Sequence, residues 1–160
     1  MHYVLDTGFF ADSRVYYQDV FPGFWEKIKD AVNQDVISSV EEVRAELERY
    51  GGPQEHLLDW IKDHRNIFTQ PSLAEQDKVR QILAVPEFQA LVSSKNRLKG
   101  HPAADPFVIA KAWELGGSVV TTERKGSGNT PRIGIPYACE QFKVRCILPE
   151  TFMEEMDWRF

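Results

Sequence analysis

Residues 104–123 read ADPFVIAKAWELGGSVVTTE, a helix followed by a strand. The helix is predicted over 104–115, with Pro106 in its first turn, where a proline is tolerated, and the pair of glycines after it ends the helix. The strand 118–121 follows directly and runs into Glu123. This stretch therefore predicts an α/β unit that leaves an acidic residue at the carboxyl end of a strand.

The same alternation of short apolar strands and helices recurs along the chain. Strands are expected at 3–5, 36–37 and 144–147, with short extended pieces at 67–68 and 133–135. Helices are expected in two parts over 9–33, from a cap at Ser38 or Ser39 to an end at the glycines of 51–53, and over 54–64. Further helices are expected over 72–94 with a break at Pro86, near 137–142 and from Pro149. The pattern predicts the fold class α/β, with a central, mostly parallel sheet flanked by helices.

Length and composition are typical of one globular domain, 1–160, because 42% of the 160 residues are hydrophobic and 27% are charged. No apolar run is long enough to span a bilayer, and the start MHYVLDTGFF lacks the pattern of a signal peptide. We therefore expect a cytoplasmic protein that does not bind a membrane. Cys139 and Cys146 are the only cysteines, so neither a zinc site nor a disulfide framework is expected, and both are predicted to be small buried side chains near the C-terminal strand.

The charge is distributed unevenly. The formal net charge is −5, yet the segments 93–101 and 124–132 contain cations and no acid. Their cations are Lys95, Arg97, Lys99, Arg124, Lys125 and Arg132. These side chains either hold an RNA backbone by its phosphates without reading the bases, or belong to an ordinary solvated surface.

Several carboxylates occur where parallel sheets bind ligands, at the carboxyl ends of strands. Asp6 follows the first strand, Glu123 follows the strand 118–121, and Asp105 opens the helix before that strand. A fourth acid comes from the helix after the second strand. It is either Glu46 or Glu42, which are one turn apart on the same helix face.

Carboxylates that converge in this way repel one another. At about 4 Å and an effective dielectric constant near 20, each pair costs roughly 4 kcal/mol, so a cation is expected to compensate them. Carboxylate oxygens without Cys or paired His favour Mg²⁺ or Mn²⁺. Each acid alone has an ordinary alternative, which is a surface group for Asp6, a helix N-cap for Asp105 and a plain loop acid for Glu123.

Four motifs in this order carry the acids: VLDTG (4–8), ISSVEEVRAEL (37–47), ADPFVIAKA (104–112) and VVTTE (119–123). Together they resemble the motifs of the PIN-domain family of nucleases. In that family the first motif is a strand that ends in Asp and a hydroxyl residue, and the last is a strand followed by Thr, any residue and an acid.

The resemblance implies a single PIN-like nuclease domain over 1–160 that binds Mg²⁺ or Mn²⁺. The implied metal ligands are Asp6, Glu46 ahead of Glu42, Asp105 and Glu123, and the implied catalytic set adds Thr121, while Thr7 supports Asp6. It also implies an endoribonuclease that hydrolyses RNA phosphodiester bonds, in a longer variant of the toxin ribonucleases that an antitoxin protein holds inactive.

Two other functions compete with this one. A catalytically silent PIN-like module would bind RNA or a protein without cleaving. An aspartyl-phosphate phosphatase would also begin at a strand ending in Asp, but it usually needs a second Asp two residues later, and position 8 is Gly. The aromatic-rich region 9–33 leaves open whether it buries a homodimer face or only the core.

Overall fold

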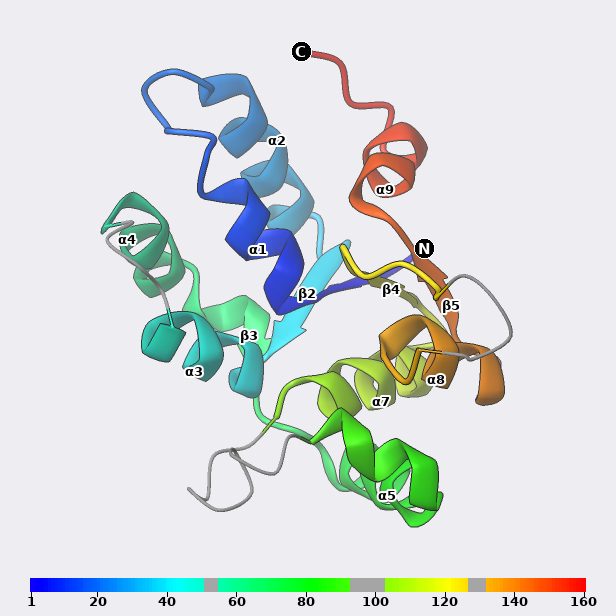
Figure 1. Ribbon diagram of the computed structural model, residues 1–160. Coiled ribbons are helices and arrows are strands. Elements are labelled where there is room, and N and C mark those ends of the chain that lie inside the picture. The colour runs from blue at the N-terminus through cyan, green and yellow to red at the C-terminus, as the bar shows by residue number, and fades with distance from the viewer. Residues whose placement is uncertain (51–54, 93–102, 127–131) are drawn as a thin grey trace.

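Strands that all run parallel to one another form the central sheet. The computed structural model describes residues 1–50, 55–92, 103–126 and 132–160, and within these residues it contains a five-stranded sheet with the order β3-β2-β1-β4-β5 (Figure 1). The strands are β1 (Tyr3–Leu5), β2 (Ile37–Val40), β3 (Phe68–Thr69), β4 (Ser118–Val120) and β5 (Arg145–Ile147). The predicted α/β fold with a parallel sheet flanked by helices is confirmed.

Helices cover both faces of this sheet. They are α1 (Thr7–Ser13), α2 (Pro22–Asn33), α3 (Glu41–Tyr50), α4 (Glu55–Asp63), α5 (Leu73–Ala84), α7 (Asp105–Leu115), α8 (Ile135–Gln141) and α9 (Pro149–Glu155), with 3₁₀ turns at Arg65–Ile67 and Pro86–Leu91. Figure 1 shows α1, α2 and α9 on one side of the sheet and α5, α7 and α8 on the other. Among the described residues, no helix is both long and apolar enough to cross a membrane.

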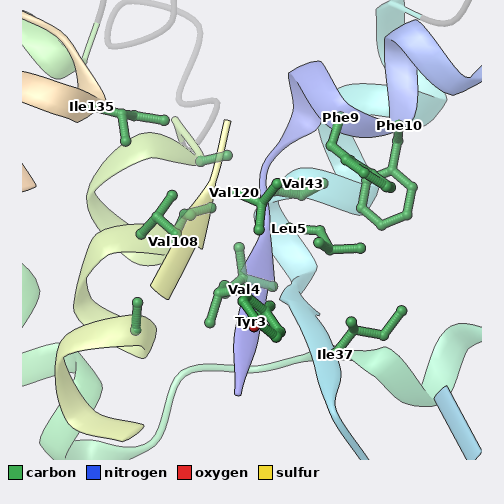
Figure 2. Packing of buried hydrophobic residues seen from close by; sticks show 14 of the residues in the cluster. Tyr3, Val4, Leu5, Phe9, Phe10, Ile37, Val43, Val108, Val120 and Ile135 are labelled. Atoms are coloured by element: carbon green, nitrogen blue, oxygen red, sulfur yellow. The ribbon is translucent and has the colours of Figure 1, made fainter. Parts of the chain in front are cut away.

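The central strand β1 anchors the core because it is apolar on both faces. Val4 and Leu5 are fully buried, and Figure 2 shows Phe9 and Phe10 of α1 to one side of the strand and Val108 of α7 to the other. A strand buried on both faces reads as an apolar run rather than as an alternating pattern. The polar residue that comes directly after this run is Asp6, which is therefore carried into the interior.

Helix α7 forms much as the sequence predicts. It contacts β1, β2 and β4 and packs against α5 and α8, and its Val108 and Ile109 are fully buried. Its N-cap is Ala104, so Asp105 is the first helical residue and not the cap.

The region around β2 differs from the sequence prediction. Ser38 and Ser39 do not cap a helix, because both belong to the strand, which ends at Val40. Ser39 pairs with Phe68 of β3, and its hydroxyl donates a 2.7 Å hydrogen bond to the carbonyl of Leu5. The hydroxyl thus ties β2 to the end of β1.

The aromatic region between β1 and β2 is also divided differently. Phe24, Trp25 and Ile28 of α2 belong to the core as expected. In contrast, the segment 14–21 is not helical, and its Val15 and Val20 are exposed. Because α1 ends at Ser13 and α2 begins at Pro22, these apolar residues lie in the connection, and the homodimer face stays a prediction.

The C-terminal third follows the prediction with shifted boundaries. Ile135 opens α8 instead of ending an extended piece, since Pro136 is tolerated in the first turn of a helix. Cys139 is buried and Cys146 is half-buried, and both are free thiols. The predicted glycine-rich end of α3, at 51–53, lies outside the described residues.

Replacing Ser39 by Ala tests the link between β2 and β1. The change leaves the buried Leu5 carbonyl without its hydroxyl donor, so the free energy of unfolding should fall by about 1–3 kcal/mol, measured by urea denaturation. Ser38→Ala is the control, because the Ser38 hydroxyl bonds the half-buried His2 ring. A larger loss in Ser38→Ala than in Ser39→Ala would contradict the assignment.

Candidate functional site

The residues around the carboxyl ends of β1 and β4 bring acidic side chains together. Asp6 follows β1, Glu123 lies shortly after β4, and Asp105 begins α7. The negative charges of Glu46 and Glu123 act on both Asp6 and Asp105, so these four carboxylates lie within electrostatic range of one another. We call them the acidic cluster.

Asp6 is the most deeply buried member, with 5% of its surface exposed. The Thr121 hydroxyl donates to its Oδ2 at 2.9 Å, and the backbone N–H of Thr7 donates to it as well. The pKa of Asp6 is nevertheless raised to about 6, first by burial and then by the charges of Glu123 and Glu46, against the effect of the two hydrogen bonds. The fold thus holds Asp6 at a position that disfavours the ionised form of its carboxyl group.

The ionised form of Asp105 is disfavoured in the same way. Its pKa lies well above the ordinary value, first because of burial and then because of the charges of Asp6, Glu123 and Glu46. A hydrogen bond from its own backbone N–H offsets little of this. Neighbouring carboxylates that raise each other's pKa are the arrangement that a bound cation relieves.

Glu46 connects three elements at the site. Its Oε2 accepts a 2.7 Å hydrogen bond from the hydroxyl of Thr7, and its Oε1 accepts a 3.0 Å bond from the backbone N–H of Ala104. The side chain therefore joins α3 to the starts of α1 and α7. Thr7 supports two acids at once, Asp6 through its backbone and Glu46 through its hydroxyl.

Glu42 lies in a different environment one turn earlier in α3. Its side chain is buried, and its pKa is raised by burial and then by the charges of Glu41 and Glu75. Glu75 in turn faces the buried Lys111, whose ammonium nitrogen lies 3.8 Å away and donates to the Thr69 hydroxyl at 2.7 Å. The structure therefore brings Glu46 to the acidic cluster and leaves Glu42 beside α5.

Glu123 is held by the start of α8. Its Oε2 accepts a 3.0 Å hydrogen bond from the backbone N–H of Ile135, and its own N–H donates to the Thr121 hydroxyl. A Cβ at Gly134 would lie 2.5 Å from that Oε2, so the residue before α8 has to be small. Sequence reasoning missed Gly134 and Ile135. The available signal was a Gly directly before a helix with proline in its first turn.

Gly8 is needed for space as well. A Cβ at this position would lie 2.3 Å from the Thr122 Oγ1 and 3.5 Å from the Asp6 Oδ2. A second aspartate two residues after Asp6, which phosphatase chemistry usually requires, would therefore collide with Thr122.

Of the predicted basic residues, the structure places three. Arg124 and Lys125 are exposed next to Glu123 and pair with Glu150 and Glu140 at 2.9 and 3.0 Å. Arg132 is exposed, too. The predicted Lys95, Arg97 and Lys99 lie outside the described residues. Exposed ion pairs of this kind are weak, so Arg124 and Lys125 can exchange their partners for other anions.

One member of the acidic cluster, Glu123, lies at a cavity of about 400 Å³. Glu123, Lys125 and Cys146 line it. Within the residues the structure describes, no group of three or more His, Cys, Asp or Glu side chains is arranged as a metal site. The donor set of the cluster still has the chemistry that hard divalent cations prefer, because it consists of carboxylate oxygens, and the pKa values of Asp6 and Asp105 are raised.

Fold and site together define an all-parallel α/β domain with buried, mutually repelling carboxylates at the carboxyl edge of its sheet. The chain belongs to the DUF4411 family, a domain of unknown function, whose model matches residues 3–160. None of the curated proteins searched matches the chain.

The raised pKa of Asp6 makes stability depend on pH. The pKa of Asp6 is about 6 in the folded protein and 3.8 in an ordinary aspartate, so the folded state binds the proton more tightly than the unfolded state. Without added metal, the free energy of unfolding should therefore fall by about 3 kcal/mol as the pH rises from 4 to above 6. Asp6→Asn should remove this part of the pH dependence and be more stable than the wild type at pH 7.5. Thermal denaturation across pH checks it.

Asp19→Asn is the control for that experiment, because Asp19 is exposed on the connection between α1 and α2. Its pH profile should match that of the wild type. If the pH profile of Asp6→Asn also matches that of the wild type, the ionised Asp6 carboxylate does not destabilise the folded protein.

Proposed function

We propose that this protein is an endoribonuclease that depends on Mg²⁺ or Mn²⁺ and hydrolyses RNA phosphodiester bonds. The observation that carries the proposal is the burial of Asp6 beside Asp105, two carboxyl groups whose pKa values are raised by burial and by the same neighbouring acids. Repulsion between these carboxylates destabilises the fold unless a bound cation compensates their charge, so the arrangement indicates a functional site. The motif resemblance to PIN-domain nucleases points to the same chemistry.

In this proposal Asp6, Glu46, Asp105 and Glu123 hold the cation. When bound, such an ion would supply a water of lowered pKa and would stabilise charge on a phosphate. Thr121 orients Asp6 through their 2.9 Å hydrogen bond, while backbone N–H groups orient Glu46 and Glu123. Anchored acids of this kind do not have to reorganise during the reaction.

The same site suggests where RNA would lie. Arg124 and Lys125 are exposed next to Glu123, and their acidic partners are themselves exposed, so RNA phosphates could replace them. In the proposal these two cations, with Arg132, Lys95, Arg97 and Lys99, hold the RNA backbone and carry no sequence information.

Control by a partner protein is part of the proposal. A cytoplasmic ribonuclease that needs only an abundant ion would damage the RNA of its own cell. We therefore propose an antitoxin that places an Arg or Lys among Asp6, Glu46 and Asp105 and covers Arg124 and Lys125 with acids. The alternative is a silent module with the same surface, which would bind RNA or protein without cleaving it.

RNA cleavage by two glutamine variants on helix α3 distinguishes the ribonuclease from the silent binding module. Glu46→Gln should lower the rate of Mg²⁺-dependent cleavage of single-stranded RNA by more than about 100-fold, as Asp105→Asn should, because each removes a proposed ligand. Glu42→Gln is the matched control and should cleave at close to the wild-type rate, since Glu42 faces Glu75. Gel electrophoresis of labelled RNA checks these rates.

Intact RNA with the wild-type protein and either cation would leave the silent module as the better account. Equal rates from wild type and Glu46→Gln, together with an inactive Glu42→Gln, would move the site toward α5. Melting temperatures equal to or above that of the wild type would show that lost cleavage does not result from unfolding.

RNA binding offers a second test. Replacing both Arg124 and Lys125 by Ala should lower the slope of log affinity against log salt concentration by roughly 0.7 for each lost phosphate contact. The control pair is Lys62→Ala with Arg80→Ala, two exposed cations that are also ion-paired but lie on α4 and α5. An unchanged slope in the Arg124 and Lys125 variant would assign both residues to the solvated surface.

A further inference from the structure

A second cavity, of about 360 Å³, lies next to the cavity that Glu123 lines, and the two share Arg124 and Leu148. It is enclosed by α1 with the connection that follows it, by the segment after β4 and by the start of α9. Its size is within the range of small-molecule sites in proteins. None of the acids of the cluster lines it, so the cavity is separate from the proposed metal ligands.

The cavity nevertheless adjoins the cluster at the segment that follows β4. Thr122 lies on its wall, between Thr121, which bonds Asp6, and Glu123. The close approach of Thr122 to Gly8 sets this wall directly against the start of α1, where Asp6 precedes the helix. A group in this cavity would be next to a phosphate at the cluster.

Aromatic side chains form one wall. Tyr16 and Phe24 stack with ring centroids 4.7 Å apart and an angle of 28° between their planes, and both line the cavity. Tyr16 is partly exposed, at 36%. Such rings are the surfaces on which unpaired RNA bases stack.

The polar groups of the cavity differ in charge. Asp12, at the end of α1, lines the cavity and is exposed, and within the described residues it takes part in no hydrogen bond or ion pair. Arg124 lines it too and bonds Glu150 at 2.9 Å. A ligand that suits this cavity therefore offers donors to a carboxylate and an anion to a guanidinium.

Guanine has the matching edge. Its N1–H and N2–H₂ are adjacent donors that a carboxylate can accept together, whereas adenine presents a single donor group beside an acceptor on the same edge. The phosphate of the same nucleotide would take the place of Glu150 at Arg124. We propose that this cavity binds a guanine base of single-stranded RNA next to the scissile phosphate, an inference that rests on the proposed ribonuclease function for its RNA substrate.

Binding of mononucleotides tests the cavity without any cleavage. In isothermal titration calorimetry with EDTA present, guanosine 5′-monophosphate should bind the full chain roughly tenfold more tightly than adenosine 5′-monophosphate, the effect expected for one added charged hydrogen bond. Asp12→Asn should abolish this preference, because its amide group presents a donor to the donors of guanine. Tyr16→Ala should weaken the binding of both nucleotides alike, because stacking does not depend on the identity of the base.

Asp19→Asn is the control, since Asp19 is exposed on the connection that follows α1 but does not line the cavity. It should keep the guanine preference. Equal affinity for the two nucleotides, no binding of guanosine 5′-monophosphate, or an unchanged preference in Asp12→Asn would each overturn the inference.

Failure of the guanine site can be distinguished from failure of the proposed ribonuclease function. Asp105→Asn should lose cleavage and keep the guanine preference. If the wild type selects guanine through Asp12 but cleaves no RNA, the cavity stands and the proposed function fails. If it cleaves RNA but does not distinguish the nucleotides, only the cavity assignment fails.

Discussion

The hydrogen bond from the Thr121 hydroxyl to Asp6, inside the gap where β1 and β4 end, is the contact on which the site depends. It holds a carboxylate in the interior, where burial and the charges of neighbouring acids raise the pKa of Asp6 to about 6. The same hydroxyl accepts the N–H of Glu123, so one threonine positions acids from two segments. Its own burial leaves it no alternative partner in water, and this fixes the geometry.

The acids around Asp6 also serve the fold. Glu46 accepts the N–H of Ala104 just before α7, and Glu123 accepts the N–H of Ile135 at the start of α8. The first N–H groups of a helix have no partner within it, and the positive end of the helix dipole stabilises a negative charge there. These contacts explain how a domain can hold four repelling carboxylates together. The hydrogen bonds that Glu46 and Glu123 accept from the backbone offset part of the repulsion.

The predictions that were wrong share a physical origin. Val15, Tyr16 and Val20 have the spacing of a helix face, but the chain there connects two helices and exposes them. Ser38 and Ser39 are good helix caps in isolation, yet the neighbouring strand and the Leu5 carbonyl use their backbone and side chains. In both cases a local preference gave way to a partner distant in the sequence.

The sequence by itself determined the parallel α/β fold, the positions of Asp6 and Glu123 after the strands β1 and β4, and the start of α7 near Asp105. Apolar runs and helix breakers act over a few residues, so they can be read locally. The motif resemblance put Glu46 ahead of Glu42, but only the tertiary structure showed the different surroundings of the two glutamates and why positions 8 and 134 are glycines. The two glutamates share a helix face, and what each meets depends on how α1, α5 and α7 pack against it, because the interactions of a buried carboxylate come from distant elements.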